Sequence, residues 1–134
     1  MSEIKNFNIN ETFQMAIQSH REGNIVKAKN LYSKVLELDP NHENANINIG
    51  VIFQQLGEFQ SAKKCYENVL KNNSNNIRAY TNLGVVFKNL GEIEEAKKYF
   101  EKAIEISPNS SEAHINLGVI FQELEKDEKV YADD

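Results

Sequence analysis

The chain has 134 residues, of which 40% are hydrophobic, 9% aromatic and 26% charged, so its composition is that of a globular protein and excludes disorder and collagen. Fifteen Lys and Arg residues against 20 Asp and Glu residues give a net charge of −5, which argues against nucleic-acid binding. There is no membrane-spanning apolar run, no basic and apolar leader, and only one cysteine, so we expect a cytoplasmic protein that does not bind membranes.

Seven helices are predicted from apolar residues that recur at helical spacing. In chain order they cover residues 11–22, 25–38, 43–56, 59–72, 77–90, 93–106 and 111–124. Residues 1–9 are expected to fray or to add part of a turn, and the last ten residues form either a short helix or a disordered acidic tail. Because the turns between helices are short, neighbouring helices are predicted to run antiparallel.

Glycine, alanine and aromatic residues in and between these helices repeat with a period of 34 residues. The repeating sets are Gly23, Gly57, Gly91; Gly50, Gly84, Gly118; Ala28, Ala62, Ala96; Tyr32, Tyr66, Phe100; and Phe53, Phe87, Phe121. The first glycine set follows a helix, where a left-handed residue ends it. The second set lies inside helices, and we expect a neighbouring helix backbone to approach there, with the alanines on the facing helix. Such a period is typical of a solenoid.

The pattern resembles the tetratricopeptide repeat (TPR). The family's eight signature positions are matched in the third repeat by Tyr80, Leu83, Gly84, Phe87, Ala96, Phe100, Ala103 and Pro108. The second repeat has Val69 and Ser74 in place of the usual Ala and Pro, and the first repeat is looser. The resemblance implies an all-α, right-handed solenoid of antiparallel helix pairs. It would be a single domain over residues 1–134, with repeats at 9–42, 43–76 and 77–110 and a partial repeat at 111–134.

Solenoids of this kind expose the first helix of each repeat on a concave face, where a peptide is predicted to bind. One exposed position forms an amide ladder, namely Gln14, Asn48, Asn82 and Asn116. Carboxamides offer donors and an acceptor, which suits an extended peptide backbone. The ladder resembles that of the O-linked N-acetylglucosamine transferases, where the family's asparagines hold peptide backbone. The alternative is that asparagine is simply common in this chain.

The remaining predicted groove residues lie on the same helices. The apolar floor consists of Phe13, Ile17, Ile47, Val51, Thr81, Val85, Ile115 and Val119, and the polar rim of His20, Gln54, Lys88 and Gln122. The alternative is that some of these residues pack against the preceding repeat.

Some TPR domains hold the C-terminal carboxylate of heat-shock chaperones in a two-lysine clamp. Only Asn48 and Arg78 match that clamp here, whereas Phe13, Ile17 and Asn82 occupy the places of its lysine, asparagine and arginine. We therefore do not expect an adaptor for chaperone tails. Arg78 lies one turn before Asn82 and remains a candidate contact for an acidic group of the ligand.

No catalytic residue, metal site or cofactor is predicted. His20, His42 and His114 have no metal-ligand spacing with Cys65 or with one another. We interpret Cys65 as a half-buried packing residue and His114 as an interface residue. The main hypothesis is a non-enzymatic protein–protein interaction scaffold. The alternatives are the substrate-recognition part of a larger enzyme, such as a glycosyltransferase or sulfotransferase, and a self-assembling structural module.

The repeat pattern breaks after residue 124. Glu125 stands where Gly57 and Gly91 stood, so the apolar face of residues 111–124 lacks its second helix. Six acids and two bases between residues 123 and 134 make the tail acidic. Two outcomes remain open: a homodimer through the C-terminal helix, or a tail that folds back with Val130 and Tyr131 over the gap.

Overall fold

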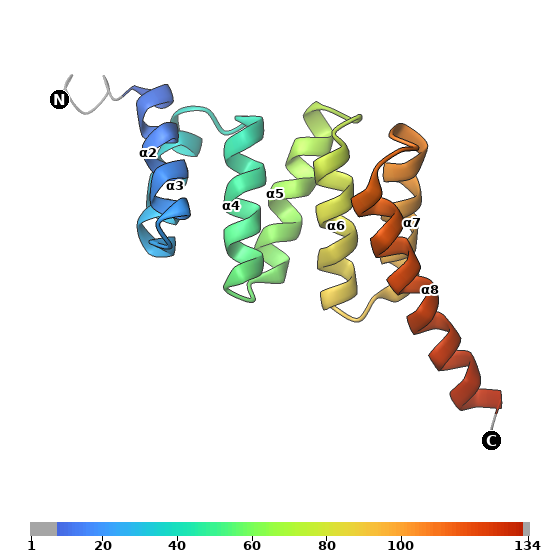
Figure 1. The fold of residues 1–134 in the computed structure, drawn as a ribbon. Coiled ribbons are helices and arrows are strands. Elements are labelled where there is room, and N and C mark those ends of the chain that lie inside the picture. Colours follow the sequence, from blue (N-terminus) through green and yellow to red (C-terminus); the bar gives the residue numbers. More distant parts are fainter. Residues whose placement is uncertain (1–7, 133–134) are drawn as a thin grey trace. The chain divides into compact units, whose positions relative to one another are not determined.

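The computed structural model describes residues 8–132, with side chains through residue 128. These residues form seven α-helices (Figure 1). The helices are α2 (Ile9–Arg21), α3 (Ile25–Leu38), α4 (Glu43–Gln55), α5 (Phe59–Asn72), α6 (Ile77–Asn89), α7 (Ile93–Ile106) and α8 (Ser111–Ala132). The predicted all-α fold of paired helices is confirmed. Among the described helices, none combines the length and the hydropathy that crossing a bilayer requires.

Helix boundaries agree with the sequence prediction except at the two ends of the described chain. The first helix starts at Ile9, two residues early, because the Asn8 side chain accepts hydrogen bonds from the backbone N–H groups of Asn10 and Glu11. Asn24 and Asn76 cap α3 and α6 in the same way, so part of the asparagine content has a structural role. The last helix does not end near residue 124 but continues to Ala132.

The chain divides into two compact units, each described here by itself: unit 1 ends at Asn72 and unit 2 begins at Asn73. In unit 1, α2 packs on α3, α4 packs on α5, and α3 packs on α4. In unit 2, α6 packs on α7, and α8 packs mainly on α7 with a smaller contact to α6. Each unit therefore repeats the same helix hairpin, and unit 2 ends on α8.

Left-handed glycines end the first helix of each hairpin, as predicted. Gly57 has a φ of 76°, its N–H donates to the Gln54 carbonyl, and the Glu58 N–H donates to the Phe53 carbonyl at 2.7 Å. This pair of bonds satisfies carbonyls that the end of a helix leaves without partners. Gly91 has a φ of 80° and repeats the arrangement at the end of α6.

The second glycine set makes room for aromatic rings. A Cβ atom added to Gly50 would lie 2.6 Å from Cε1 of Tyr66, and one added to Gly84 would lie 2.5 Å from Cε1 of Phe100. The prediction that a neighbouring backbone approaches these glycines is therefore wrong. The separation of two packed helices depends on the side chains between them, and here a whole ring from the second helix lies on the glycine.

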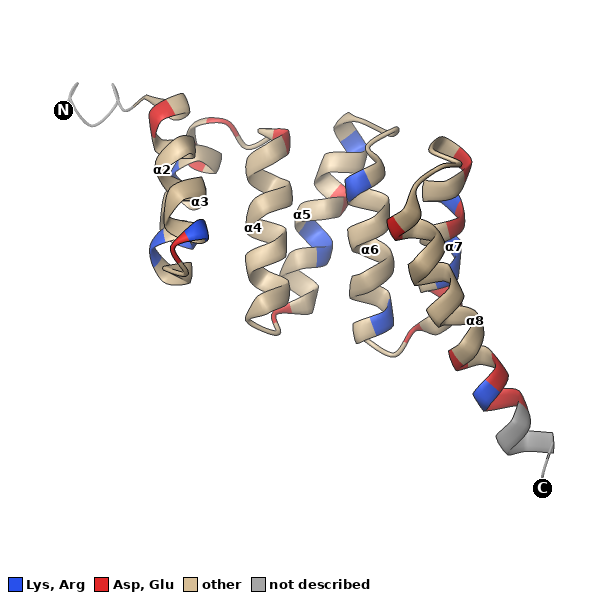
Figure 2. Ribbon diagram, in the orientation of Figure 1, with Lys and Arg blue, Asp and Glu red and all other residues tan. Residues whose placement is uncertain are grey.

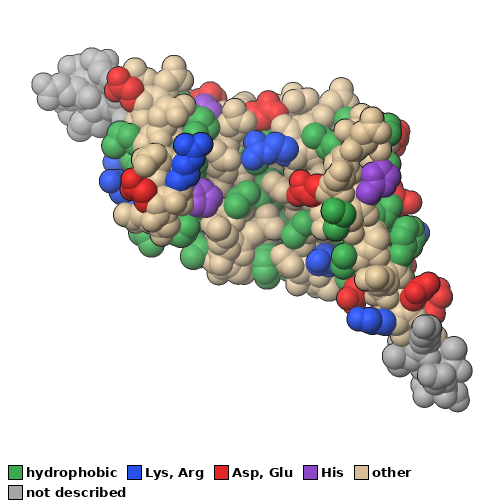
Figure 3. All heavy atoms as spheres, viewed as in Figure 1, with side chains coloured by type: hydrophobic (Ala, Val, Ile, Leu, Met, Phe, Trp, Pro, Cys, Tyr) green, Lys and Arg blue, Asp and Glu red, His purple; other side chains and the backbone are tan. Residues whose placement is uncertain are grey.

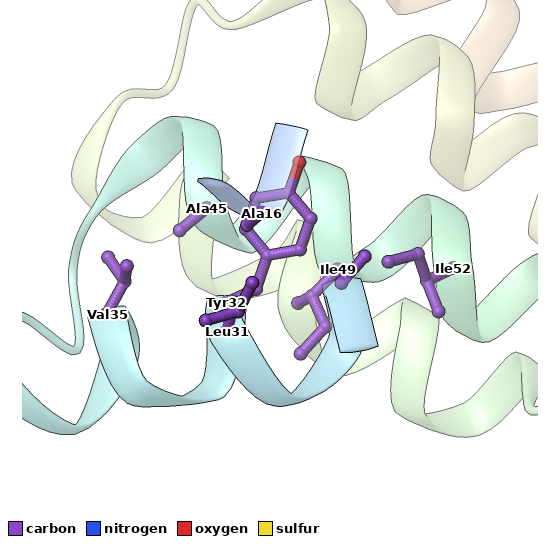
Figure 4. Packing of buried hydrophobic residues seen from close by; sticks show 8 residues of the cluster. Ala16, Leu31, Tyr32, Val35, Ala45, Ile49 and Ile52 are labelled. Atoms are coloured by element: carbon purple, nitrogen blue, oxygen red, sulfur yellow. The ribbon is translucent and has the colours of Figure 1, made fainter. Parts of the chain in front are cut away.

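The core of unit 1 is built around Tyr32 from α3. Its ring lies among small and branched side chains from α2, α3 and α4 (Figure 4). The buried members of this core are Ala16, Ala28, Leu31, Tyr32, Val35, Ala45, Ile49 and Ile52. Tyr32 is 1% exposed, and its hydroxyl accepts a hydrogen bond from the half-buried Asn48.

One hydrogen bond recurs in α4, α6 and α8, and it joins each of these helices to the turn before it. The Asn46 amide donates to the Pro40 carbonyl at 3.0 Å, and the Tyr80 hydroxyl donates to the Ser74 carbonyl at 3.0 Å. Nε2 of His114 lies 2.8 Å from the Pro108 carbonyl, and it must donate because a carbonyl only accepts. His114 is exposed, and its ring holds the turn; its role as an interface residue stays a prediction.

Candidate functional site

Helices α4 and α6 carry few charges, which determines the chemical character of their exposed faces. The only charged residue of α4 is Glu43, and α6 has only Arg78 and Lys88 (Figure 2). The second helices differ; α7 alone carries four glutamates and three lysines. A ligand on α4 or on α6 would therefore meet mostly uncharged polar and apolar groups.

In unit 1 the central predicted residue, Asn48 on α4, is held by the core. It is half-buried, and its Nδ2 donates to the hydroxyl of Tyr32 at 3.2 Å. Burial raises the pKa of Tyr32, and the hydrogen bond from Asn48 opposes that shift. Within the described part of the chain, the carboxamide oxygen of Asn48 has no hydrogen-bond partner. The side chain is thus fixed in place while one acceptor remains available.

Other predicted residues of unit 1 surround Asn48 to different degrees. Val51 is half-buried one turn further along α4, and Gln14 on α2 is exposed. Gln54 accepts a hydrogen bond from the buried Tyr66 hydroxyl, so it belongs partly to the packing between α4 and α5. His20 at the end of α2 contacts Gln55 at 3.0 Å. The structure therefore brings Asn48, Val51 and Gln54 together along α4.

In unit 2 the predicted residues lie on α6 and α8, which are in contact. Asn82, Val85 and Lys88 follow one another at helical spacing on α6, and all three are half-buried. Asn116 and Val119 are half-buried on α8. In the residues that the structure describes, neither asparagine side chain makes a hydrogen bond. Arg78 is exposed one turn before Asn82.

Two residues of the predicted groove floor are not accessible. Ile47 is fully buried, and Thr81 is 3% exposed, with its hydroxyl donating to the Ile77 carbonyl. The floor assignment is wrong for both, because they pack inside the protein. Phe13 is half-buried, and its ring lies against those of Tyr32 and His42. By contrast, Ile115 is 67% exposed.

The cysteine and histidines form no reactive site. Cys65 is half-buried against the core of unit 1, and burial raises its pKa to about 11. Burial therefore favours the neutral thiol, and the contact of Cys65 with the core confirms its predicted packing role. Among the described residues, no group of three His, Cys, Asp or Glu side chains could hold a metal ion.

Sequence reasoning missed the tyrosine hydroxyls that hold the groove residues. Tyr32 binds Asn48, and Tyr66 binds Gln54, each from a second helix to a first helix. The signal was present in the repeating aromatic set, where a phenylalanine, Phe100, takes the third position and removes the hydroxyl.

Comparisons with known proteins agree with this architecture. Three models of the tetratricopeptide repeat match residues 20–86, 77–110 and 99–129, and the first of these covers half of the chain. A comparison with curated proteins found no matching sequence.

Several solved structures are similar to this chain over most of its length. The first TPR domain of Spaghetti (RPAP3), solved with the HSP90 peptide SRMEEVD, is 26% identical, with 87% of this chain and 92% of that chain covered and a TM-score of 0.82. MamA from Desulfovibrio magneticus RS-1 is 25% identical, with 96% and 72% covered and a TM-score of 0.83. The Sgt2 TPR domain from Aspergillus fumigatus is 19% identical, with 90% and 82% covered and a TM-score of 0.84.

These matches agree with the paired helices described above. The chain belongs to the tetratricopeptide-repeat family, and its described helices form about three and a half repeats.

Proposed function

We propose that this protein is a non-enzymatic interaction module that binds an extended peptide segment along the first helices of its repeats. The observation that carries the proposal is a half-buried asparagine beside a half-buried valine at the same position of three repeats, as in Asn82 and Val85. Such an asparagine is restrained by its surroundings and still reaches solvent. The similar TPR domain of Spaghetti was solved with a peptide, which supports the same use of this fold.

The carboxamides would bind the peptide backbone. Asn48 gives an N–H to Tyr32, so its oxygen remains to accept from a peptide N–H. Asn82 and Asn116 have both their donors and their acceptor available for the alternating groups of an extended strand. This is the role of the asparagine ladder that the chain's resemblance to O-linked N-acetylglucosamine transferases implies. The valines add apolar contact that favours small apolar side chains in the ligand.

The ligand we propose differs from the HSP90 tail. A carboxylate clamp needs a cation on α2, and this chain has Phe13 there, with its ring packed against Tyr32 and His42. The basic residues of α6 are the exposed Arg78 and the half-buried Lys88. An acidic side chain of the ligand would therefore bind at α6, rather than a terminal carboxylate at α2.

The continuous 34-residue register through residues 72–76 supports the further proposal that residues 1–134 act as one domain. The single half-buried cysteine is consistent with the cytoplasmic location that we propose.

The test starts with peptides selected on the intact chain from a random peptide library, followed by titration of each peptide by fluorescence anisotropy. The variant carries Asn82→Ala and Asn116→Ala, and the matched control carries Asn30→Ala and Asn89→Ala, both exposed. One hydrogen bond lost at each asparagine costs about 0.5–1.5 kcal/mol, so the double variant should bind roughly 5- to 160-fold more weakly. Equal affinity for variant and control would refute the proposal.

The peptide SRMEEVD provides a second arm of the same experiment. We expect no saturable binding of it to the intact chain, because α2 lacks the clamp's cation. Tight binding that is lost on substitution of Arg78 would show that the chain binds a carboxylate through residues other than those of the two-lysine clamp.

A further inference from the structure

The last helix presents a face on which an expected neighbour is missing. Gly118 is equivalent to Gly50 and Gly84, each of which lies under an aromatic ring of the following helix. At Gly118 nothing lies within 4 Å of an added Cβ atom, and the residue is exposed. Phe121, one turn further on, is 46% exposed. The described residues therefore leave uncovered a surface that two other repeats cover.

The reason lies at Glu125. Gly57 and Gly91 end their helices at φ values near 76° and 80°, a conformation that a residue with a side chain adopts only at a cost. With glutamate at the equivalent position, α8 continues to Ala132 and carries the chain away from the face of Gly118 (Figure 1).

A groove of about 770 Å³ adjoins this face, between the start of α7 and the second half of α8. Its apolar lining comes from Ile93, Phe121 and Leu124. Nζ of Lys97 lies 5.5 Å from the centre of the Phe121 ring, and Lys29 lies 5.2 Å from the Phe53 ring at the equivalent place in unit 1. The pair α7 and α8 is thus arranged like α3 and α4, and in unit 1 the next helix, α5, packs on α4.

The charge of the groove restricts what can bind there. Glu94, Glu125, Asp127 and Glu128 line it, and Lys97 is the single base among its described lining residues. Acidic side chains also gather on the last described turns of α8 in the space-filling view (Figure 3). A second copy of α8 would bring the same acids against these, so a symmetric pairing of α8 helices is opposed by like charges. A basic partner is complementary.

We propose that this face of α8, together with the groove, is a docking site for a basic amphipathic helix of another protein that carries the pattern Ala-x-x-x-Tyr or Ala-x-x-x-Phe. The pattern is that of the chain's own second helices, as in Ala62 with Tyr66 and Ala96 with Phe100. In the docked complex the partner's ring lies over Gly118, and its basic residues face Glu125 and Glu128. This site is independent of the asparagines on the first helices.

The probe is a synthetic peptide with the sequence of residues 59–72, with Cys65→Ser and a lactam between Glu67 and Lys71 on its exposed face to keep it helical. Fluorescence anisotropy with the intact chain should show saturable binding at micromolar to millimolar concentrations. The same peptide with Tyr66→Ala should bind at least tenfold more weakly. Absence of saturable binding, or equal binding of the two peptides, would overturn the proposal.

The matched protein variant is Gly118→Ala. Its Cβ atom would occupy the place of the ring, as at Gly50 and Gly84, so we expect at least a tenfold loss of peptide affinity. Because Gly118 has open space around it, the melting temperature should stay the same or rise, which separates lost docking from lost folding. Undiminished affinity with this variant contradicts the proposal.

Two further variants test the charges and the identity of the occupant. Glu125→Ala should weaken peptide binding several-fold at low salt, whereas Glu112→Ala, an exposed acid at the other end of α8, should not. Light scattering at several concentrations gives the remaining outcome. If the chain forms a dimer that Phe121→Glu dissociates, the face is occupied by a second copy and the partner-helix proposal fails.

Discussion

The same substitution should have opposite effects on stability at two equivalent glycines. In Gly84→Ala the new Cβ atom would lie 2.5 Å from Cε1 of Phe100, whose ring is fully buried and cannot move aside. Overpacking of this kind costs about 1–3 kcal/mol, and the better helix propensity of alanine returns roughly 1 kcal/mol. We therefore expect a net loss of up to about 2 kcal/mol. In Gly118→Ala the new Cβ atom meets no neighbour, and alanine has the better helix propensity. We therefore expect the free energy of unfolding to rise by about 0.5–1 kcal/mol.

Urea denaturation followed by far-ultraviolet circular dichroism measures both changes, provided that the slope of the free energy against urea is the same in each variant. A double variant isolates the ring: in a Phe100→Leu background, Gly84→Ala should no longer destabilise, because the clashing ring atoms are gone. Shifts of the same sign and size at Gly84 and Gly118, or an unchanged penalty in the double variant, would refute the explanation of these glycines by ring packing.

The remaining predictions concern single side chains. Asn82→Ala should change the free energy of unfolding by no more than about 0.5 kcal/mol in urea titrations, since the side chain makes no hydrogen bond among the described residues. Tyr32→Phe should cost about 0.5–1.5 kcal/mol, because it removes the acceptor of the Asn48 amide; a stability equal to that of the parent chain would show that this bond is not formed. Burial raises the pKa of Cys65 from 9.0 to about 11, so the folded state favours the neutral thiol. Stability should therefore fall as pH rises from about 9 towards 11, and alkylation of folded protein near pH 8 should be slow; a rate like that of a free thiol would contradict the burial.

Much of the fold could be predicted from the sequence because the repeat fixes several features together. The left-handed glycines, the apolar spacing and the turn lengths all indicate the same helix hairpin, and the structure places the helices within about two residues of the prediction up to α7. The length of α8 was less determined. Its last residues include good helix formers, but they lack the apolar spacing that marks the other helices, and a charged tail of that composition is also compatible with disorder.

The parts that the sequence left open depend on which side chains meet across helices. Gly50 was identified as a close-packing position, but only the three-dimensional arrangement shows that a tyrosine ring, and not a backbone, fills the space. Ile47 and Val51 lie one turn apart on the same side of α4. Ile47 is nevertheless fully buried, whereas Val51 is half-buried. Helical periodicity gives the angle of a side chain around its helix, and the neighbours decide how much of it solvent reaches.

The recurrent tie to the preceding turn shows that the repeat preserves an interaction rather than a residue. An amide, a phenol and an imidazole, from Asn46, Tyr80 and His114, all donate to the carbonyl six residues earlier. In two of these turns that carbonyl belongs to a proline, whose ring already restricts the backbone. In the third turn the carbonyl belongs to Ser74, which has no ring to restrict its backbone. There the hydrogen bond from the Tyr80 hydroxyl restrains the turn instead. Sequence divergence at this position can therefore be tolerated as long as a donor of sufficient reach remains, and a repeat that has lost its proline has most to lose when that donor is removed.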